Sequence, residues 1–275
     1  MDYQLDGRVA IVSGGSRGIG RAIAETLARE GARVVIASRT ESYLDEAAGS
    51  LESAAPGRVH AVAADMTDPA DIDRVVSAAR SRFGTISIAI SNVIGHVIDA
   101  QREGEGPGAG TFQTLEPEEY RREFRQLFIS SWALAQACIP DMRAQRWGRI
   151  CNIGSSAARE PATQLPHTLP NVVRPAVAGM HRLLAARLAQ DGITVNNILT
   201  GGILTERNAS YWRWLADSRG QSLDQVTSVV NEAIPIGRMG EPKEMAALVA
   251  FLCSAQASRV TGQSIPVNGG ASVHL

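Results

Sequence analysis

The sequence predicts an α/β fold, a single-domain, Rossmann-type doubly wound parallel sheet flanked by helices. Short apolar runs rich in valine and isoleucine recur along the chain and are separated by helix-length segments. Such runs indicate strands buried on both faces, and their alternation with helices indicates parallel β-α-β units. We expect about seven strands, at residues 9–12, 33–37, 59–63, 86–90, 149–153, 193–199 and 264–267. A chain of 275 residues suits one domain of this class.

The composition excludes several classes of protein. A hydrophobic content of 44% with 20% charged residues is enough for a large core. A formal net charge of -1 gives no electrostatic case for nucleic acid, and no apolar run is long enough to cross a membrane. The N-terminus lacks the features of a signal peptide, so we expect a cytoplasmic protein. Because Cys138, Cys151 and Cys253 lie in apolar segments without metal-ligand spacing, we expect buried free thiols and no metal site.

A glycine-rich segment, Gly-Gly-Ser-Arg-Gly-Ile-Gly at residues 14–20, directly follows the first predicted strand. An amphipathic stretch comes next, with Ile23 and Leu27 on one face and Gly31 at its end. A strand, a tight turn and a helix in this order direct backbone N–H groups and a helix N-terminus at a diphosphate. The alternative is a strand-to-helix turn with no ligand. The predicted cofactor contacts here are Gly14, Ser16, Arg17, Gly18, Ile19 and Gly20.

Ser38 and Arg39 follow the second predicted strand, where a dinucleotide fold contacts the adenosine ribose. An acidic residue at this point would accept hydrogen bonds from the ribose hydroxyls, whereas an arginine suits a 2′-phosphate. Ser38 removes the acid, and Arg39 together with Arg17 supplies positive charge. The combination favours NADP(H) over NAD(H). The alternative is that both arginines are ordinary solvated side chains.

Arg39→Ala should therefore weaken NADPH binding much more than NADH binding, because only NADPH carries the 2′-phosphate. Dissociation constants of both nucleotides, measured by fluorescence titration of the two proteins, test this expectation. Equal weakening of both nucleotides would remove the assignment of Arg39 to the 2′-phosphate.

Polar residues also follow the third and fourth predicted strands. Asp65 and Met66 come after the third, and the carboxylate of Asp65 can accept a hydrogen bond from the adenine amino group. Asn92 comes after the fourth, where it either contacts the cofactor or satisfies its own backbone as a buried turn residue. The polar, glycine-rich residues 95–115 cannot form a core, so we expect a mobile loop or partial lid there.

Short motifs run in order through nearly the whole chain. They are residues 14–20, Asp65, Asn92, Pro140 with Met142, Gly-Arg-Ile at 148–150, Ser155, Ile-Thr-Val-Asn at 193–196, Arg-Met-Gly-Glu-Pro at 238–242, Thr-Gly at 261–262 and Val-Asn-Gly-Gly at 267–270. With these motifs the chain resembles the short-chain dehydrogenase/reductase family. The resemblance implies a Rossmann-type sheet, a nicotinamide dinucleotide, a small-molecule substrate and a homotetramer or homodimer. It also implies that Gly201, Ile203 and Thr205 contact the cofactor and that residues 201–233 cover the substrate.

The departures from the family pattern fall on its catalytic residues. The family uses an asparagine on a long helix, a serine after the fifth strand, and a tyrosine followed four residues later by a lysine. Alignment to that pattern puts Leu127, Pro170 and Arg174 at the asparagine, tyrosine and lysine positions, and only Ser155 is kept. Ser155 can bond a carbonyl oxygen, and Arg174 can hold the nicotinamide ribose. Because its pKa is above ~12, Arg174 cannot relay protons.

The helix that carries Arg174 is expected to begin at Arg174 and Pro175. Pro175 lacks an N–H group and disfavours helical conformation at the residue before it. The tyrosine and lysine of the family share one helical face, and this start would break that face. We therefore expect Pro170→Tyr alone not to restore carbonyl reduction.

His167 is the one replacement proton donor that the sequence offers. It lies seven residues before Arg174, similar to the tyrosine-to-lysine spacing in enoyl-thioester reductases of the same superfamily. An imidazole with a pKa near ~6.5 can deliver a proton at neutral pH. The alternative is a solvent-facing loop histidine. Asn171 and Arg159 are further polar candidates for the pocket.

Three functions follow from this combination. The first is an NADP(H)-dependent oxidoreductase with a non-standard active site, which reduces a carbonyl or a conjugated C=C of a small organic substrate. The second is a redox-neutral isomerase, lyase or cyclase on the same scaffold. The third is a catalytically inactive NADP(H)-binding partner subunit. We favour the first, because an intact cofactor loop argues for use of the dinucleotide.

Overall fold

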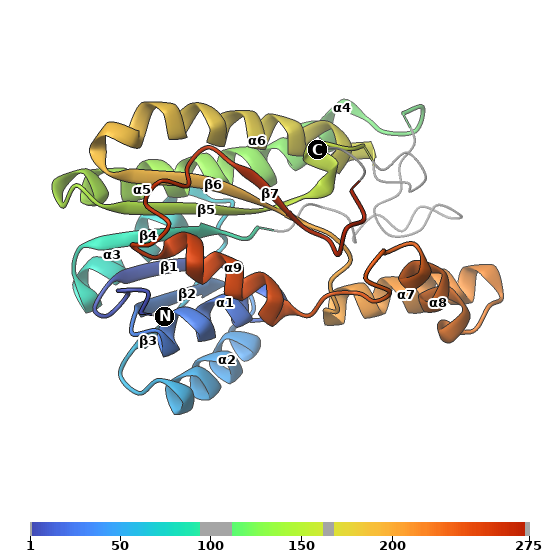
Figure 1. Cartoon of the computed structure of the whole chain (residues 1–275), viewed down its shortest axis with the longest axis horizontal. Helices are drawn as coiled ribbons and strands as arrows, with labels where there is room; N and C mark the ends of the chain where they lie inside the picture. Colours follow the sequence, from blue (N-terminus) through green and yellow to red (C-terminus); the bar gives the residue numbers. More distant parts are fainter. Residues whose placement is uncertain (1, 94–111, 162–167, 273–275) are drawn as a thin grey trace.

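The computed structural model describes residues 2–93, 112–161 and 168–272. Its centre is a seven-stranded parallel sheet in the order β3-β2-β1-β4-β5-β6-β7 (Figure 1). The strands are β1 (Val9–Ser13), β2 (Arg33–Ser38), β3 (Val59–Ala63), β4 (Ile86–Ser91), β5 (Gly148–Ser155), β6 (Ile193–Thr200) and β7 (Ser264–Val267). The predicted fold class is confirmed, and each described strand lies within two residues of its predicted bounds.

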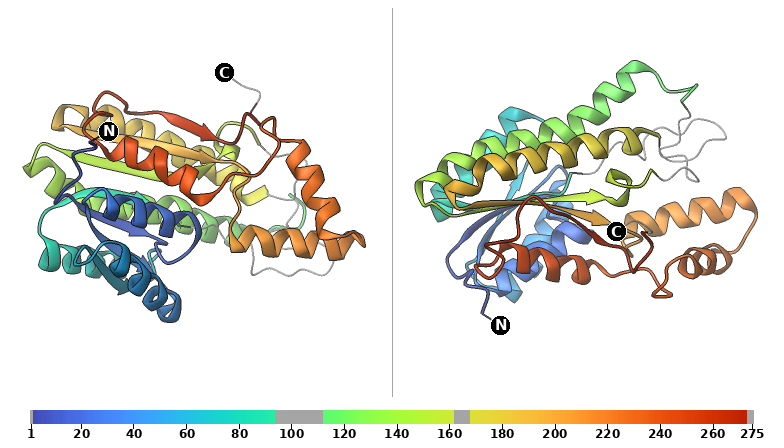
Figure 2. Two further views of the ribbon diagram at one scale, coloured as in Figure 1. Left: turned by 60° about the horizontal axis from the view of Figure 1, so that its bottom comes forward. Right: turned by 45° about the horizontal axis from the view of Figure 1, so that its top comes forward.

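Helices cover both faces of the sheet (Figures 1 and 2). They are α1 (Gly18–Arg29), α2 (Glu41–Ala54), α3 (Pro69–Phe83), α4 (Pro117–Phe124), α5 (Ser130–Ala144), α6 (Thr168–Leu188), α7 (Glu206–Arg219), α8 (Leu223–Glu232) and α9 (Pro242–Cys253). Helices α1, α2 and α9 form one hydrophobic core, and α3, α5 and α6 form another. Alternate residues of β1 divide between them, since Ala10 and Val12 pack in the first and Val9 and Ile11 in the second.

A π-helical turn, Arg125–Ile129, joins α4 to α5. Turns of this kind are uncommon and are frequent at functional sites. Leu127 lies in it with 4% of its surface exposed, and it packs with Val173 and Val177 of α6. Leu127 is thus part of the core between the turn and α6, and α4 also packs against α6.

Helix α6 begins at Thr168, so the prediction that it begins at Arg174 and Pro175 was wrong. Pro175 lies inside the helix, where the missing hydrogen bond and the ring cost about 3 kcal/mol. Burial of Leu169, Val173 and Val177 offsets this cost, at roughly 1.5–3 kcal/mol for each aliphatic side chain. Tertiary packing therefore overrides the local preference of proline.

The correction changes the geometry of the two positions that the sequence alignment predicts to be those of the catalytic tyrosine and lysine. Pro170 and Arg174 are four residues apart in one continuous helix, so they lie on the same helical face. The geometric reason for expecting Pro170→Tyr to stay inactive no longer holds.

Helices α7 and α8 project from the body of the molecule beyond the end of the sheet (Figures 1 and 2). Both start with a side-chain cap: the Thr205 hydroxyl accepts from the backbone N–H of Asn208, and Ser222 forms a capping box with Gln225. The ring of Tyr211 contacts those of Trp212 and Trp214 at centroid distances of 4.9 and 5.9 Å. These aromatics pack against one another along α7.

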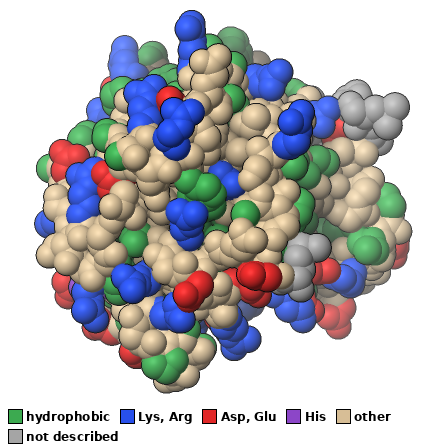
Figure 3. Space-filling view, turned by 60° about the vertical axis from the view of Figure 1, so that its left-hand side comes forward, with side chains coloured by type: hydrophobic (Ala, Val, Ile, Leu, Met, Phe, Trp, Pro, Cys, Tyr) green, Lys and Arg blue, Asp and Glu red, His purple; other side chains and the backbone are tan. Residues whose placement is uncertain are grey.

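The described residues show neither a strongly charged face in Figure 3 nor an exposed cysteine. On the face in Figure 3, basic side chains are spread out with acidic ones between them, so the described residues form no single patch of one sign there. None of the described helices combines the length and the apolar character that a membrane span requires. Cys138, Cys151 and Cys253 are buried free thiols, as predicted.

Candidate cofactor and active site

The glycine-rich loop is so compact that Gly14 and Gly20 have no room for a side chain. Gly14 and Gly18 have φ of +63° and +53°, a region that favours glycine. A Cβ added at Gly20 would overlap the carbonyl oxygen of Gly14 and lie 2.6 Å from Nδ2 of Asn92. The loop leads directly into the N-terminus of α1 at Gly18, so backbone donors gather at the carboxyl end of β1.

Asn92, which follows β4, is hydrogen-bonded to β1 and to the glycine-rich loop. Its backbone N–H donates to Oγ of Ser13 at 2.8 Å, and its Nδ2 donates to the carbonyl oxygen of Gly14 at 3.3 Å. The amide of Asn92 thus satisfies a backbone group of the glycine-rich loop and not its own backbone, and its contact with the cofactor stays a prediction. Through Asn92, the end of β4 holds the shape of the glycine-rich loop.

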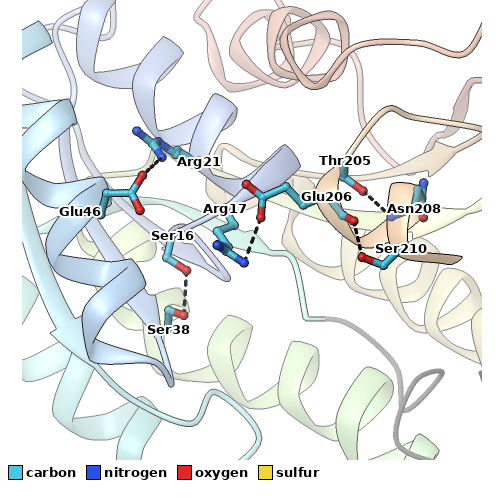
Figure 4. Close-up of polar contacts among 9 residues, drawn as sticks. All are labelled: Ser16, Arg17, Arg21, Ser38, Glu46, Thr205, Glu206, Asn208 and Ser210. Atoms are coloured by element: carbon cyan, nitrogen blue, oxygen red, sulfur yellow. Dashed lines mark hydrogen bonds and ion pairs between the residues drawn. The ribbon is translucent and has the colours of Figure 1, made fainter. Parts of the chain in front are cut away.

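Hydroxyl and guanidinium groups lie at the end of the loop where an adenosine would bind (Figure 4). Oγ of Ser16 donates to Oγ of Ser38 at 2.9 Å. The guanidinium of Arg17 lies 3.4 Å over the ring of Tyr43. Arg39 is exposed and, among the described residues, forms no ion pair. The structure therefore brings Ser16, Arg17 and Ser38 together, with Arg39 at the end of β2.

Asp65 and Met66 differ in what they leave available to a nucleotide. Oδ1 of Asp65 accepts from the backbone N–H and the hydroxyl of Thr67, at 2.9 and 2.8 Å, and so caps the turn after β3. Its second carboxylate oxygen can still accept a bond. The side chain of Met66 is buried in the core around α3, so only its backbone is left for a ligand.

The segment after β6 places its predicted cofactor residues over the loop. Gly201 leaves no space for a side chain, because a Cβ there would lie 2.5 Å from Cβ of Asn268. Ile203 is buried and forms a β-bridge with Gly240. The methyl of Thr205 lies 3.3 Å from the point where a Cβ of Gly18 would be. The structure thus brings the start of α7 to the glycine-rich loop.

Ser155 occupies the carboxyl end of β5. It is partly exposed, and its Oγ accepts from the backbone N–H of Ala157 at 3.3 Å, so its proton remains free to donate to a ligand. His167, the candidate proton donor, lies outside the described residues, and so do residues 95–111 of the loop predicted at 95–115.

Arg174 points back toward the sheet. Its Nη1 donates to the carbonyl oxygen of Ile153 at 3.2 Å, and its Nε is buried without a hydrogen-bond partner among the described residues. Burial lowers the pKa of Arg174, and the negative charge of Glu123 opposes that shift. Arg174 thus places a cation between α6 and β5, one helical turn after Pro170.

Glu123 was missed by the sequence reasoning. It is 0% exposed on α4, and its negative charge raises the pKa of Arg174 on α6. An acidic residue four positions before the inward-facing Leu127 was the available signal, since residues four apart share a helical face. Such an acid is more often solvated, and only packing of α4 on α6 shows otherwise.

A buried polar chain deeper in the fold was also missed. His181 of α6 is 2% exposed; its Nδ1 donates to the carbonyl oxygen of Val177 at 2.8 Å, and Oγ of Ser131 lies 3.2 Å from its Nε2. Asn152 then links Ser131 to Asn197, at 3.5 and 2.6 Å. Burial lowers the pKa of His181 to about 4, so the ring is neutral near pH 7.

The described residues fit a phosphorylated dinucleotide. The glycine-rich loop is a tight turn in which a Cβ at Gly20 would overlap the carbonyl oxygen of Gly14, and Arg39 at the end of β2 supplies an exposed cation. At the other end, Nε of Arg174 and Oγ1 of Thr200 are buried polar atoms with no partner among the described residues. Buried polar groups are normally paired, so these atoms suit the polar groups of a bound ligand.

Known proteins share the sequence and the fold along the whole chain. A family model described as enoyl-(acyl carrier protein) reductase matches residues 14–272. The 3-oxoacyl-[acyl-carrier-protein] reductase of Vibrio cholerae is 31% identical and covers 97% of this chain and 98% of its own. Dehydrogenase/reductase SDR family member 4 of Bos taurus is 32% identical over 98% and 89% of the two chains. L-Sorbose reductase of Gluconobacter frateurii, whose structure holds NADPH and L-sorbose, superposes with a TM-score of 0.91 at 32% identity over 100% of both chains. The chain therefore belongs to the short-chain dehydrogenase/reductase family of oxidoreductases.

Proposed function

We propose that this oxidoreductase uses NADP(H) in preference to NAD(H) and reduces a carbonyl or a conjugated C=C of a small organic substrate. The observation that carries the proposal is the closed glycine-rich loop with Arg17 and Arg39 at its adenosine end. L-Sorbose reductase, which is similar over its whole length, was solved with NADPH. When bound, the nicotinamide would supply a hydride.

The residues around that hydride divide the remaining work. Ser155 donates its hydroxyl proton in a hydrogen bond to the substrate oxygen, which orients the carbonyl. Arg174 places a positive charge behind the site, and the carboxylate of Glu123 favours its charged form. Neither Leu127 nor Pro170 can donate a proton, so proton delivery falls to another group. We propose His167 or a water molecule for this role.

The proline at position 170 favours two alternative functions. It occupies the position one turn before Arg174 where a reductase of this family would carry its proton donor, and it has no ionisable group. A redox-neutral isomerase, lyase or cyclase, or an inactive NADP(H)-binding subunit, would not need a donor at that position. These alternatives retain the same cofactor loop.

Isotope transfer from NADPH deuterated at C4 tests the proposal. Reduction of ketones or enones should put deuterium in the product, and mass spectrometry of the product measures it. Ser155→Ala should lower kcat/KM by roughly 10²–10³-fold, the effect of losing one donor to a reacting oxygen, with little change in NADPH affinity. Turnover without label would support redox-neutral chemistry, and NADPH binding without any turnover would support an inactive subunit.

A further inference from the structure

An ion pair joins the glycine-rich loop to the N-terminus of α7 (Figure 4). Nη1 of Arg17 lies 2.9 Å from Oε2 of Glu206. Arg17 is the N-cap residue of α1, and Glu206 is the first residue of α7. A carboxylate from the segment that follows β6 is therefore paired with one of the two arginines predicted to suit a 2′-phosphate.

The local structure of α7 fixes Glu206 in this place. Thr205 caps the helix by accepting from the backbone N–H of Asn208 at 3.2 Å, and Nδ2 of Asn208 donates to the carbonyl oxygen of Ile203 at 2.7 Å. The methyl of Thr205 rests on Gly18. The residue that follows Thr205 must then present its side chain beside the loop. The backbone path at the start of α7 thus places Glu206 within reach of Arg17.

The guanidinium of Arg17 is positioned but not sequestered. It stacks on Tyr43, and its edge faces the carboxylate of Glu206. The side chains of Arg17 and Glu206 are 45% and 73% exposed, and ion pairs in water contribute little to stability. The carboxylate can therefore be displaced by a stronger anion. A phosphate monoester carries a charge of about -1.5 to -2 at pH 7 and can bond an arginine through two parallel hydrogen bonds.

The neighbouring cations are in different situations. Arg21 is paired with Glu46 at 3.2 Å, on the far side of α1 from Glu206 (Figure 4). Arg39 has no ion pair among the described residues. Among Arg17, Arg21 and Arg39, only Arg17 is paired with a residue of the predicted substrate-covering segment, 201–233. A phosphate that binds Arg17 would therefore have to displace Glu206.

We propose that Glu206 is a specificity residue for the cofactor: its carboxylate competes with the 2′-phosphate of NADP(H) for Arg17 and so reduces the preference for NADP(H) over NAD(H). NADH carries no 2′-phosphate, so its binding leaves the pair of Arg17 and Glu206 in place. The inference rests on the proposed use of NADP(H).

Dissociation constants of NADPH and NADH for Glu206→Gln, measured by isothermal titration at low salt, test this inference. NADPH should bind about two- to fivefold more tightly, which is the strength of an exposed ion pair, and NADH should change less. The gain should shrink at high salt, because ions screen exposed charges. In an Arg17→Gln background, Glu206→Gln should have no effect on NADPH. Asp73→Asn, which removes an exposed carboxylate from α3, is the matched control and should leave both constants unchanged.

The outcomes separate this inference from the function on which it rests. An equal gain for NADPH and NADH, or a gain that persists in the Arg17→Gln background, would show that Glu206 acts through its general field, and the inference would fail while NADP(H) use stands. If the unmodified protein bound NADH but not NADPH, the proposed cofactor preference itself would fail, and the inference with it.

Discussion

Gly20→Ala should abolish NADPH binding and destabilise the protein. The added Cβ overlaps the carbonyl oxygen of Gly14 and lies 2.6 Å from Nδ2 of Asn92, and neither group is the flexible end of a long side chain. The loop must open to relieve the overlap, and its N–H groups then no longer converge on one point. Loss of two charge-assisted hydrogen bonds, at about 1.5–3 kcal/mol each, raises the dissociation constant of NADPH by ~100-fold or more. Overpacking also lowers the free energy of unfolding by roughly 1–3 kcal/mol.

Gly49→Ala is the matched control for this change. Gly49 is exposed within α2, and a Cβ there would meet no atom within 4 Å. Alanine in an exposed helix is more favourable than glycine by up to ~1 kcal/mol, so this variant should be slightly stabilised and should bind NADPH normally. Calorimetric titration and urea unfolding of both variants measure the effects. A Gly20→Ala protein that bound NADPH like the unmodified chain would contradict the cradle assigned to the loop.

The protein should lose about 3 kcal/mol of stability through His181 as the pH falls from 6.5 to 4. The pKa of this histidine is lowered by burial from 6.5 to about 4, so the folded state keeps the ring neutral while the unfolded state takes up a proton. The contribution of His181 is fully present above pH 6.5 and is lost as the pH falls through 4. A difference of about 2.5 units at ~1.36 kcal/mol each gives the magnitude.

Urea unfolding at intervals between pH 7 and pH 4 measures this slope. His181→Gln should be less stable at pH 7, because it disturbs the bonds to Ser131 and Val177, but its stability should depend less on pH over this range. His60→Gln, which changes a histidine of β3 outside this polar chain, is the matched control and should keep the slope of the unmodified protein. Identical slopes for all three proteins would disprove the role of His181.

The fold could be predicted because buried parallel strands leave continuous apolar runs in the sequence. β1 is buried along its whole length, and its four predicted residues are all apolar. The start of α6 could not be predicted in the same way. The rule for Pro175 is local, whereas the helix persists because Val173 and Val177 pack on Leu127, which is far away in the chain. Tertiary packing overrides a local conformational preference when distant residues bury enough apolar surface.

The same distinction separates the found from the missed residues of the site. The glycine-rich loop, Ser38 and Thr205 lie at or within a few residues of the carboxyl ends of strands, and these ends converge at one edge of a parallel sheet. The roles of Glu123, His181 and Glu206 depend on charged or polar groups of other helices and loops. A single acid or histidine in an amphipathic helix carries no sign of such a partner. Their roles required the packing of one element on another.

The π-helical turn at Arg125–Ile129 has a consequence for the charge balance of the active site. A π turn holds one residue more than the α-helical path would, and one residue rotates a helix by about 100°. Relative to α5, the turn therefore sets the azimuth of the whole of α4. With a regular helix in its place, the side chain of Glu123 would point in another direction, away from its present place on the α6 side of α4. A one-residue irregularity in the backbone thus sets where this negative charge lies relative to Arg174, whose pKa it raises.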